Sequence, residues 1–103
     1  MPYIICFAQY PPYLANEVAQ KYLETLQKHP VPDYVKRVVP AANRDTMEGI
    51  QILNIDEVKI ADEGKATEYM TKFMLEFRNI KEFRWEIKTW ATVVEGLKYI
   101  GMG

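Results

Sequence analysis

The strongest constraint on the fold is an alternation of side chains over residues 82–91, Glu-Phe-Arg-Trp-Glu-Ile-Lys-Thr-Trp-Ala. A period of two predicts a β-strand with two unlike faces. The mostly apolar face carries Phe83, Trp85, Ile87, Thr89 and Ala91, and the opposite face carries Arg84, Glu86, Lys88, Trp90 and Thr92. We therefore expect a sheet whose apolar face is covered by another layer.

Three further segments have the composition of strands. Residues 3–10 are short, apolar and aromatic, and Pro11-Pro12 ends them because proline donates no ladder hydrogen bond. Residues 34–42 and 49–58 are rich in Val and Ile, and the short polar connector 43–48 predicts an antiparallel hairpin. Pro40 indicates that the first arm of this hairpin is an edge strand or is irregular.

Two segments repeat their apolar residues with the period of a helix. The first covers residues 14–28, and the second covers residues 61–79. Their apolar stripes are Val18, Tyr22, Leu23 and Leu26 in the first, and Ala66, Met70, Phe73, Met74 and Phe77 in the second. A short terminal helix follows to about residue 100, with Thr92 and Glu95 as a capping box and Gly101 as its C-cap.

The predicted order is β-α-β-β-α-β with a short C-terminal helix, in one α+β domain over residues 1–103. Right-handed crossovers would place both main helices on one face of a four-stranded antiparallel sheet. This is the ferredoxin-like plan.

Composition excludes several classes of function. The chain has 13 Lys and Arg against 14 Asp and Glu, so it lacks the basic excess of a nucleic-acid-binding protein. No apolar run approaches the roughly 20 residues of a membrane span, and the N-terminus lacks the basic region of a signal peptide. A single cysteine forms no internal disulfide, which favours a cytoplasmic location. No metal-ligand spacing or cofactor motif is present.

The uncovered face of the sheet is predicted to be unusually apolar. Residues 3–10 place Ile4, Cys6 and Ala8 on one side and Tyr3, Ile5 and Phe7 on the other. A free face with this much apolar surface is typical of an association surface. We therefore expect a homodimer in which two sheets meet face to face.

The order of elements, the length and the two-faced strands resemble the dimeric α+β barrel superfamily. The segments Gln-Tyr-Pro-Pro (residues 9–12) and Glu-Phe-Arg-Trp-Glu-Ile-Lys-Thr-Trp (residues 82–90) are similar to an uncharacterised group of small proteins within it. The superfamily includes monooxygenases, stress-responsive proteins and polyketide cyclases. The resemblance implies a homodimer, and its activities vary too widely for the fold alone to imply one.

Six residues form the candidate ligand site on the sheet face or in a cleft beside it: Arg37, Gln51, Arg84, Glu86, Lys88 and Trp90. Cations beside an aromatic ring suit a small organic or aromatic acid, with Arg84 and Lys88 as counter-charges. Tyr3 and Gln9 could point into the same space. The same residue types also favour a plain dimer interface.

Two other classes of function stay open. If Met1 is removed, Pro2 becomes a secondary amine that opens a strand, as in tautomerases, and it would be the catalytic base; a monooxygenase-like or cyclase-like activity without cofactor is the other enzymatic alternative. A purely structural oligomerisation module is the third interpretation. The only histidine, His29, is expected to lie at a helix C-terminus, and Cys6 is expected to be buried and inert.

Overall fold

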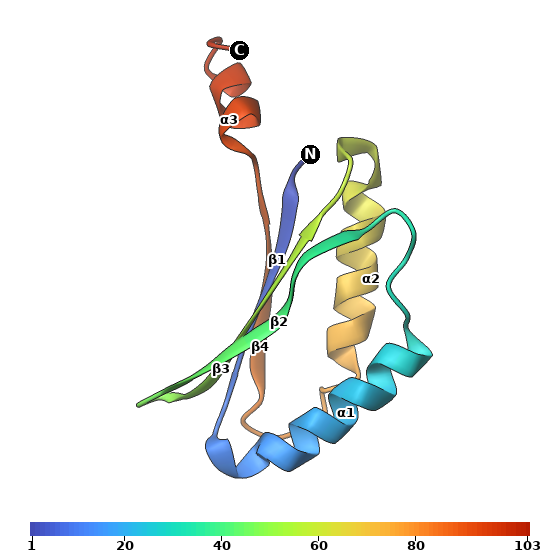
Figure 1. Cartoon of the computed structure of the whole chain (residues 1–103), viewed down its shortest axis with the longest axis vertical. Helices are drawn as coiled ribbons and strands as arrows, with labels where there is room; N and C mark the ends of the chain where they lie inside the picture. Colours follow the sequence, from blue (N-terminus) through green and yellow to red (C-terminus); the bar gives the residue numbers. More distant parts are fainter.

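The computed structural model describes all 103 residues and shows an α+β fold with a four-stranded antiparallel sheet (Figure 1). The strands lie in the order β2-β3-β1-β4. In chain order, the elements are β1 (Tyr3–Tyr10), α1 (Ala15–Lys28), β2 (Lys36–Thr46), β3 (Gly49–Glu57), α2 (Glu63–Leu75), β4 (Arg84–Trp90) and α3 (Val93–Tyr99). Single 3₁₀ turns, Pro12–Leu14 and Ile60–Asp62, lead into α1 and α2.

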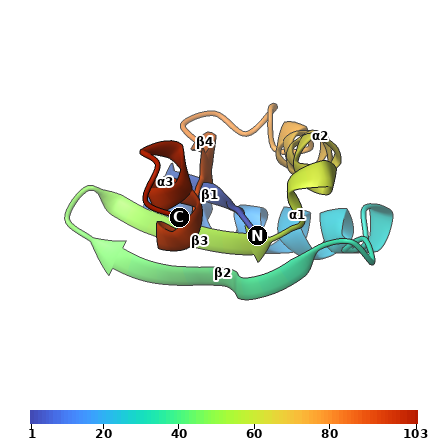
Figure 2. The same ribbon diagram turned by 90° about the horizontal axis from the view of Figure 1, so that it is seen from above.

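The hydrophobic core lies between one face of the sheet and the helices α1 and α2, which Figure 2 shows on the same side of β1 and β4. Alternate residues of β1 enter this core, and the predicted stripe of α2 is fully buried. Phe83, Trp85 and Ile87 pack against the core, while Thr89 and Ala91 are exposed. The alternation that predicted β4 is therefore confirmed over its first half.

Helix α1 turns the predicted stripe toward the core at every position except Leu23. Val18 is buried, and Tyr22 contacts Phe73 of α2 with ring centroids 5.9 Å apart. Leu23, assigned to the apolar stripe, is exposed, and Thr25 is buried instead. The Thr25 hydroxyl donates to the backbone oxygen of Lys21 at 2.6 Å, so its burial leaves no unpaired polar group.

The hairpin between β2 and β3 is tighter than the predicted connector 43–48. Strand β2 continues to Thr46, and only Met47 and Glu48 form the turn. Gly49 closes it at a φ of 131°, and a Cβ at this position would lie 2.7 Å from the backbone oxygen of Tyr10. Only glycine fits here, because both the backbone conformation and the close approach exclude a side chain.

Strand β2 is an edge strand and is irregular around Pro40, as predicted from that proline. Its pairing with β3 shifts register twice, between Arg37 and Val39 and again between Val39 and Ala42. Ala41 has a φ of 48°, and its backbone N–H donates to the side chain of Asn54 at 3.2 Å. Each shift changes which face of the sheet the following residues occupy.

The terminal helix has both predicted caps. The Thr92 side chain accepts from the Glu95 backbone, and the Glu95 carboxylate accepts from the Thr92 backbone. At the other end, Gly101 has a φ of 79°, and the N–H groups of Gly101 and Met102 bond back to Lys98 and Leu97. This is the Schellman pattern. Figure 1 shows α3 standing beyond the end of the sheet.

Candidate functional site

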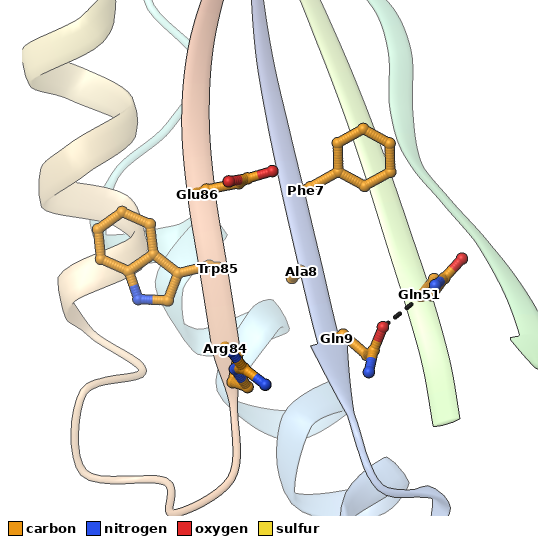
Figure 3. A pocket seen from close by; sticks show the side chains of 7 residues that line it. All are labelled: Phe7, Ala8, Gln9, Gln51, Arg84, Trp85 and Glu86. Carbon is orange, nitrogen blue, oxygen red and sulfur yellow. Dashed lines mark hydrogen bonds between the residues drawn. The ribbon is translucent and has the colours of Figure 1, made fainter. Parts of the chain in front are cut away.

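The face of the sheet turned away from α1 and α2, here called the open face, carries a cleft of about 430 Å³ (Figure 3). It lies over the end of β1 that leads to α1, and its lining residues come from β1, β3 and β4: Phe7, Ala8, Gln9, Gln51, Arg84, Trp85 and Glu86. Ala8 and Trp85 lie on the strands beneath the cleft, but their side chains belong to the covered face. Five side chains of the open face therefore set its chemistry.

A chain of side-chain hydrogen bonds crosses three strands at the polar end of the cleft. Arg44 donates from Nε to Gln51 Oε1 at 2.9 Å, and Gln51 donates from Nε2 to Gln9 Oε1 at 3.1 Å. Gln9 in turn donates to the backbone oxygen of Glu48 at 3.4 Å. These bonds orient the two amides, and each amide keeps one N–H group free to donate to a ligand.

Arg84 is the cation of the cleft and takes part in none of the ion pairs of the chain. It lies directly across from Gln9 in the ladder between β1 and β4. Glu86 is paired along its own strand with Lys88, at 3.7 Å and in solvent. Phe7 is 45% exposed and presents an aromatic ring beside these groups. The arrangement can bind an anion through a guanidinium fork next to an apolar surface.

The predicted site residues divide into three sets. Gln51, Arg84 and Glu86 lie together in the cleft. Lys88 and Trp90 share the open face but lie farther along β4, opposite Ile5 and Tyr3. Arg37 forms the third set alone.

Arg37 is on the other side of the sheet. Its guanidinium binds both carboxylate oxygens of Asp56, at 2.8 and 3.0 Å, and Asn54 donates to the same carboxylate at 3.1 Å. Asp56 is only 2% exposed. Arg37 and Asn54 also border a small cavity of about 50 Å³ in the core. Arg37 therefore belongs to a buried ion pair rather than to the cleft.

The remaining residues singled out by the sequence are buried or engaged elsewhere. Cys6 lies in the core, and burial, with a smaller effect of the Asp56 charge, raises the pKa of its thiol to about 12. A thiol of this kind is a poor nucleophile. His29 is at the C-terminal end of α1, where its ring contacts Glu76 at 3.0 Å. Pro2 is buried, and its backbone oxygen accepts from the N–H of Val58.

Two open-face residues that line the cleft, Phe7 and Gln9, were not among the six predicted site residues. The alternation of residues 3–10 places both of them on the open face, and Gln9 was expected only to point toward the same space. What the sequence lacked was the register, which sets Gln9 between Gln51 and Arg84.

No three His, Cys, Asp or Glu side chains come together as a metal site would require. No helix has both the length and the apolar character needed to cross a membrane.

Comparisons with known proteins give a likeness of fold only. The sequence matches no protein-family model and no curated protein. Among solved structures, the de novo designed protein Foldit4 is similar with a TM-score of 0.50 and 10% identity, over 88% of this chain and 96% of that one. A DUF3240 family protein from Shewanella baltica OS155 has a TM-score of 0.42 and 8% identity, over 89% of this chain and 90% of that one.

Proposed function

We propose that this chain is a homodimeric α+β barrel protein that binds a small aromatic or organic acid in the cleft beside Arg84. The finer fold assignment, a ferredoxin-like domain, is supported by the β-α-β-β-α-β order and by a sheet whose outer strands are β2 and β4. The dimeric form is supported by the open face. Tyr3, Ile5, Leu53 and Ile55 occupy it with no layer over them, and Phe7 and Trp90 on the same face are well exposed.

The ligand proposal rests on the groups that surround Arg84 in the cleft. It is an unpaired guanidinium at the wall of a cleft whose other groups are two oriented amides and the ring of Phe7. The guanidinium would form paired hydrogen bonds with a carboxylate, and the phenyl ring would pack against an apolar or aromatic body. The cleft volume of about 430 Å³ is within the usual range for small-molecule sites.

Binding of benzoate, compared with its neutral counterpart benzamide, tests this function. We expect benzoate alone to bind by calorimetry and to raise the melting temperature, since ligand at a hundred times its Kd adds about 2.7 kcal/mol to the stability of the native state. Arg84→Gln removes a charged hydrogen bond and is expected to weaken binding by about 1.5–3 kcal/mol.

The matched control is Arg78→Gln, because Arg78 is an exposed arginine in the turn after α2 and its side chain bonds only to the backbone oxygen of Leu75. It should bind benzoate like the wild type. Equal affinity of Arg84→Gln and wild type, or equal binding of benzamide and benzoate, would contradict the proposed site.

A further inference from the structure

Helix α3 carries an apolar stripe that its own chain leaves largely exposed. Val93, Val94, Leu97 and Ile100 recur at the spacing of one helix face, and Val93 and Ile100 are 76% and 70% exposed. A surface helix normally turns such a stripe toward a core. Because α3 is capped at both ends, its exposed stripe is held on a formed helix and is available to a partner surface.

The elongated shape of the chain indicates that the surface that covers α3 belongs to another molecule. Its radius of gyration is 15.0 Å, and its extents are 48 × 31 × 19 Å. A compact domain of this length has a radius of gyration of about 13 Å. Figures 1 and 2 both show α3 on the side of β1 and β4 away from α1 and α2, which is the side of the open face. A molecule that covers the open face can therefore also reach α3.

The open face has a charge pattern that selects one arrangement of two copies. Its side chains form four rows across the sheet, each with one residue from β2, β3, β1 and β4 in that order. The rows are Arg44-Gln51-Gln9-Arg84, Ala42-Leu53-Phe7-Glu86, Val39-Ile55-Ile5-Lys88 and Lys36-Glu57-Tyr3-Trp90. The two middle rows are apolar except for their β4 members.

A two-fold axis that runs across the strands reverses the order of the rows and leaves each strand over its counterpart. Glu86 of each copy then faces Lys88 of the other, so two ion pairs form between the copies. Arg84 faces the ring of Trp90, a cation–π arrangement. The apolar middle rows also face each other, and only the exposed corner residues Arg44 and Lys36 meet with like charge.

A two-fold axis that runs along the strands gives a poorer match. It places β4 of one copy over β2 of the other and each row over itself. Arg84 would then face Arg44, and the charged Glu86 and Lys88 would face Ala42 and Val39, with no opposite charge across the interface. Charge complementarity therefore favours the axis across the strands.

From this we infer that a second copy of the chain covers the open face with its strands reversed, so that α3 of each copy closes the cleft of the other. The Trp90 end of β4, which leads into α3, lies over the Arg84 end of the second copy. Trp90 and Tyr3 of the second copy then face the row of Arg84 and Gln9, and the stripe of its α3 lies just past that row, at the open end of the cleft, so each cleft is complete only in the dimer. This inference rests on the proposed homodimer and adds its orientation and the partner's contribution to the site.

Charge reversal on β4 tests the orientation. Glu86→Lys sets like charges opposite each other, and we expect the dimer dissociation constant, measured by light scattering and sedimentation, to rise by at least about tenfold. The double variant Glu86→Lys/Lys88→Glu restores opposite charges and should dimerise like the wild type. Equal dimerisation of the single variant and wild type would overturn the inference, as would a double variant no better than the single one.

Crosslinking tests the position of α3. The variants Leu97→Cys and Gln9→Cys are purified separately and then mixed with a short bismaleimide. Leu97 is exposed and Gln9 is partly exposed, whereas the native Cys6 is buried and does not compete. We expect a covalent dimer that contains one chain of each variant. The control pair Leu97→Cys and Lys72→Cys, with Lys72 exposed on α2, should give none.

The outcomes separate this inference from the proposed function. A dimeric wild type that binds benzoate but gives no Leu97–Gln9 crosslink overturns the placement of α3 and leaves the proposed function standing. A crosslinked dimer that binds no benzoate supports the placement and removes the ligand proposal. A monomeric wild type at micromolar concentration overturns this inference and the homodimer of the proposed function, whereas benzoate binding still decides the ligand proposal.

Discussion

At the scale of single residues, the core contains a buried ion pair, Arg37–Asp56, in which each charge depends on its partner. The carboxylate is almost completely buried and receives two bonds from Arg37 and one from Asn54. Removing one partner of such a pair leaves an uncompensated charge, so we expect Arg37→Met to lower the free energy of unfolding by about 3–5 kcal/mol.

The double variant Arg37→Met/Asp56→Leu removes both charges and should recover much of this loss, because an apolar pair of similar volume avoids the desolvation cost. Urea denaturation measures both effects. Lys36→Met, at an exposed neighbouring position, is the control and is expected to change stability by less than about 0.5 kcal/mol. A loss in the double variant as large as in Arg37→Met would show that the pair stabilises the fold in itself.

The same residues mark the limit of what the sequence predicts about the site. Arg84, Glu86 and Gln51 were placed correctly on one face because strand alternation is a local property. Arg37 was expected beside them, but the register shifts of β2 move it to the covered face, where Asp56 binds it. No local signal in residues 34–42 tells on which side of an irregular strand a given side chain emerges.

At the scale of elements, the end of α1 is tied to the end of α2 by Glu76. Its carboxylate contacts His29 and Lys28, both at 3.0 Å. The hydrogen bond with His29, followed by that with Lys28, lowers the pKa of Glu76 from 4.5 to about 2. A carboxyl group whose pKa is lowered by folding stabilises the protein above its unfolded pKa, and this stabilisation is lost as the pH falls through the folded value.

We therefore expect Glu76→Gln to be less stable than the wild type at pH 6, with the difference shrinking as the pH falls from about 4.5 toward 2. Urea denaturation at a series of pH values measures the difference in the free energy of unfolding. Glu68→Gln is the control, because Glu68 is exposed and paired only with Lys72 one turn along α2. A difference for Glu76→Gln that does not vary with pH would contradict the role of its charge.

Prediction of the elements succeeded where the signals are local. The caps of α3 and the stripe of α2 follow from residues three to seven positions apart. The predicted hairpin connector, residues 43–48, is too long, because the polar residues 43–46 resemble a loop and yet pair with β3. Leu23 is exposed and Thr25 is buried, because the apolar residues of α1 do not by themselves show where its buried face ends.

At the scale of the whole molecule, the core and the proposed dimer interface use opposite faces of one sheet. The covered face supplies the core, whereas the open face keeps Phe7, Leu53 and Ile55 outside it. Substitution on the open face should therefore disrupt association and leave the fold intact. This separation distinguishes an interface from a core.

Phe7→Asp places a charge in the middle of the proposed interface and is expected to give a folded monomer of about 12 kDa instead of a dimer. Circular dichroism should show a native spectrum, since the side chain is already half exposed in the single chain. Phe73→Ala, by contrast, removes a ring from the core and should cost about 3–5 kcal/mol in unfolding free energy. If Phe7→Asp instead unfolds the chain, the open face contributes to folding of the monomer; if it stays dimeric, the copies associate elsewhere, and α3 has to be covered by another surface.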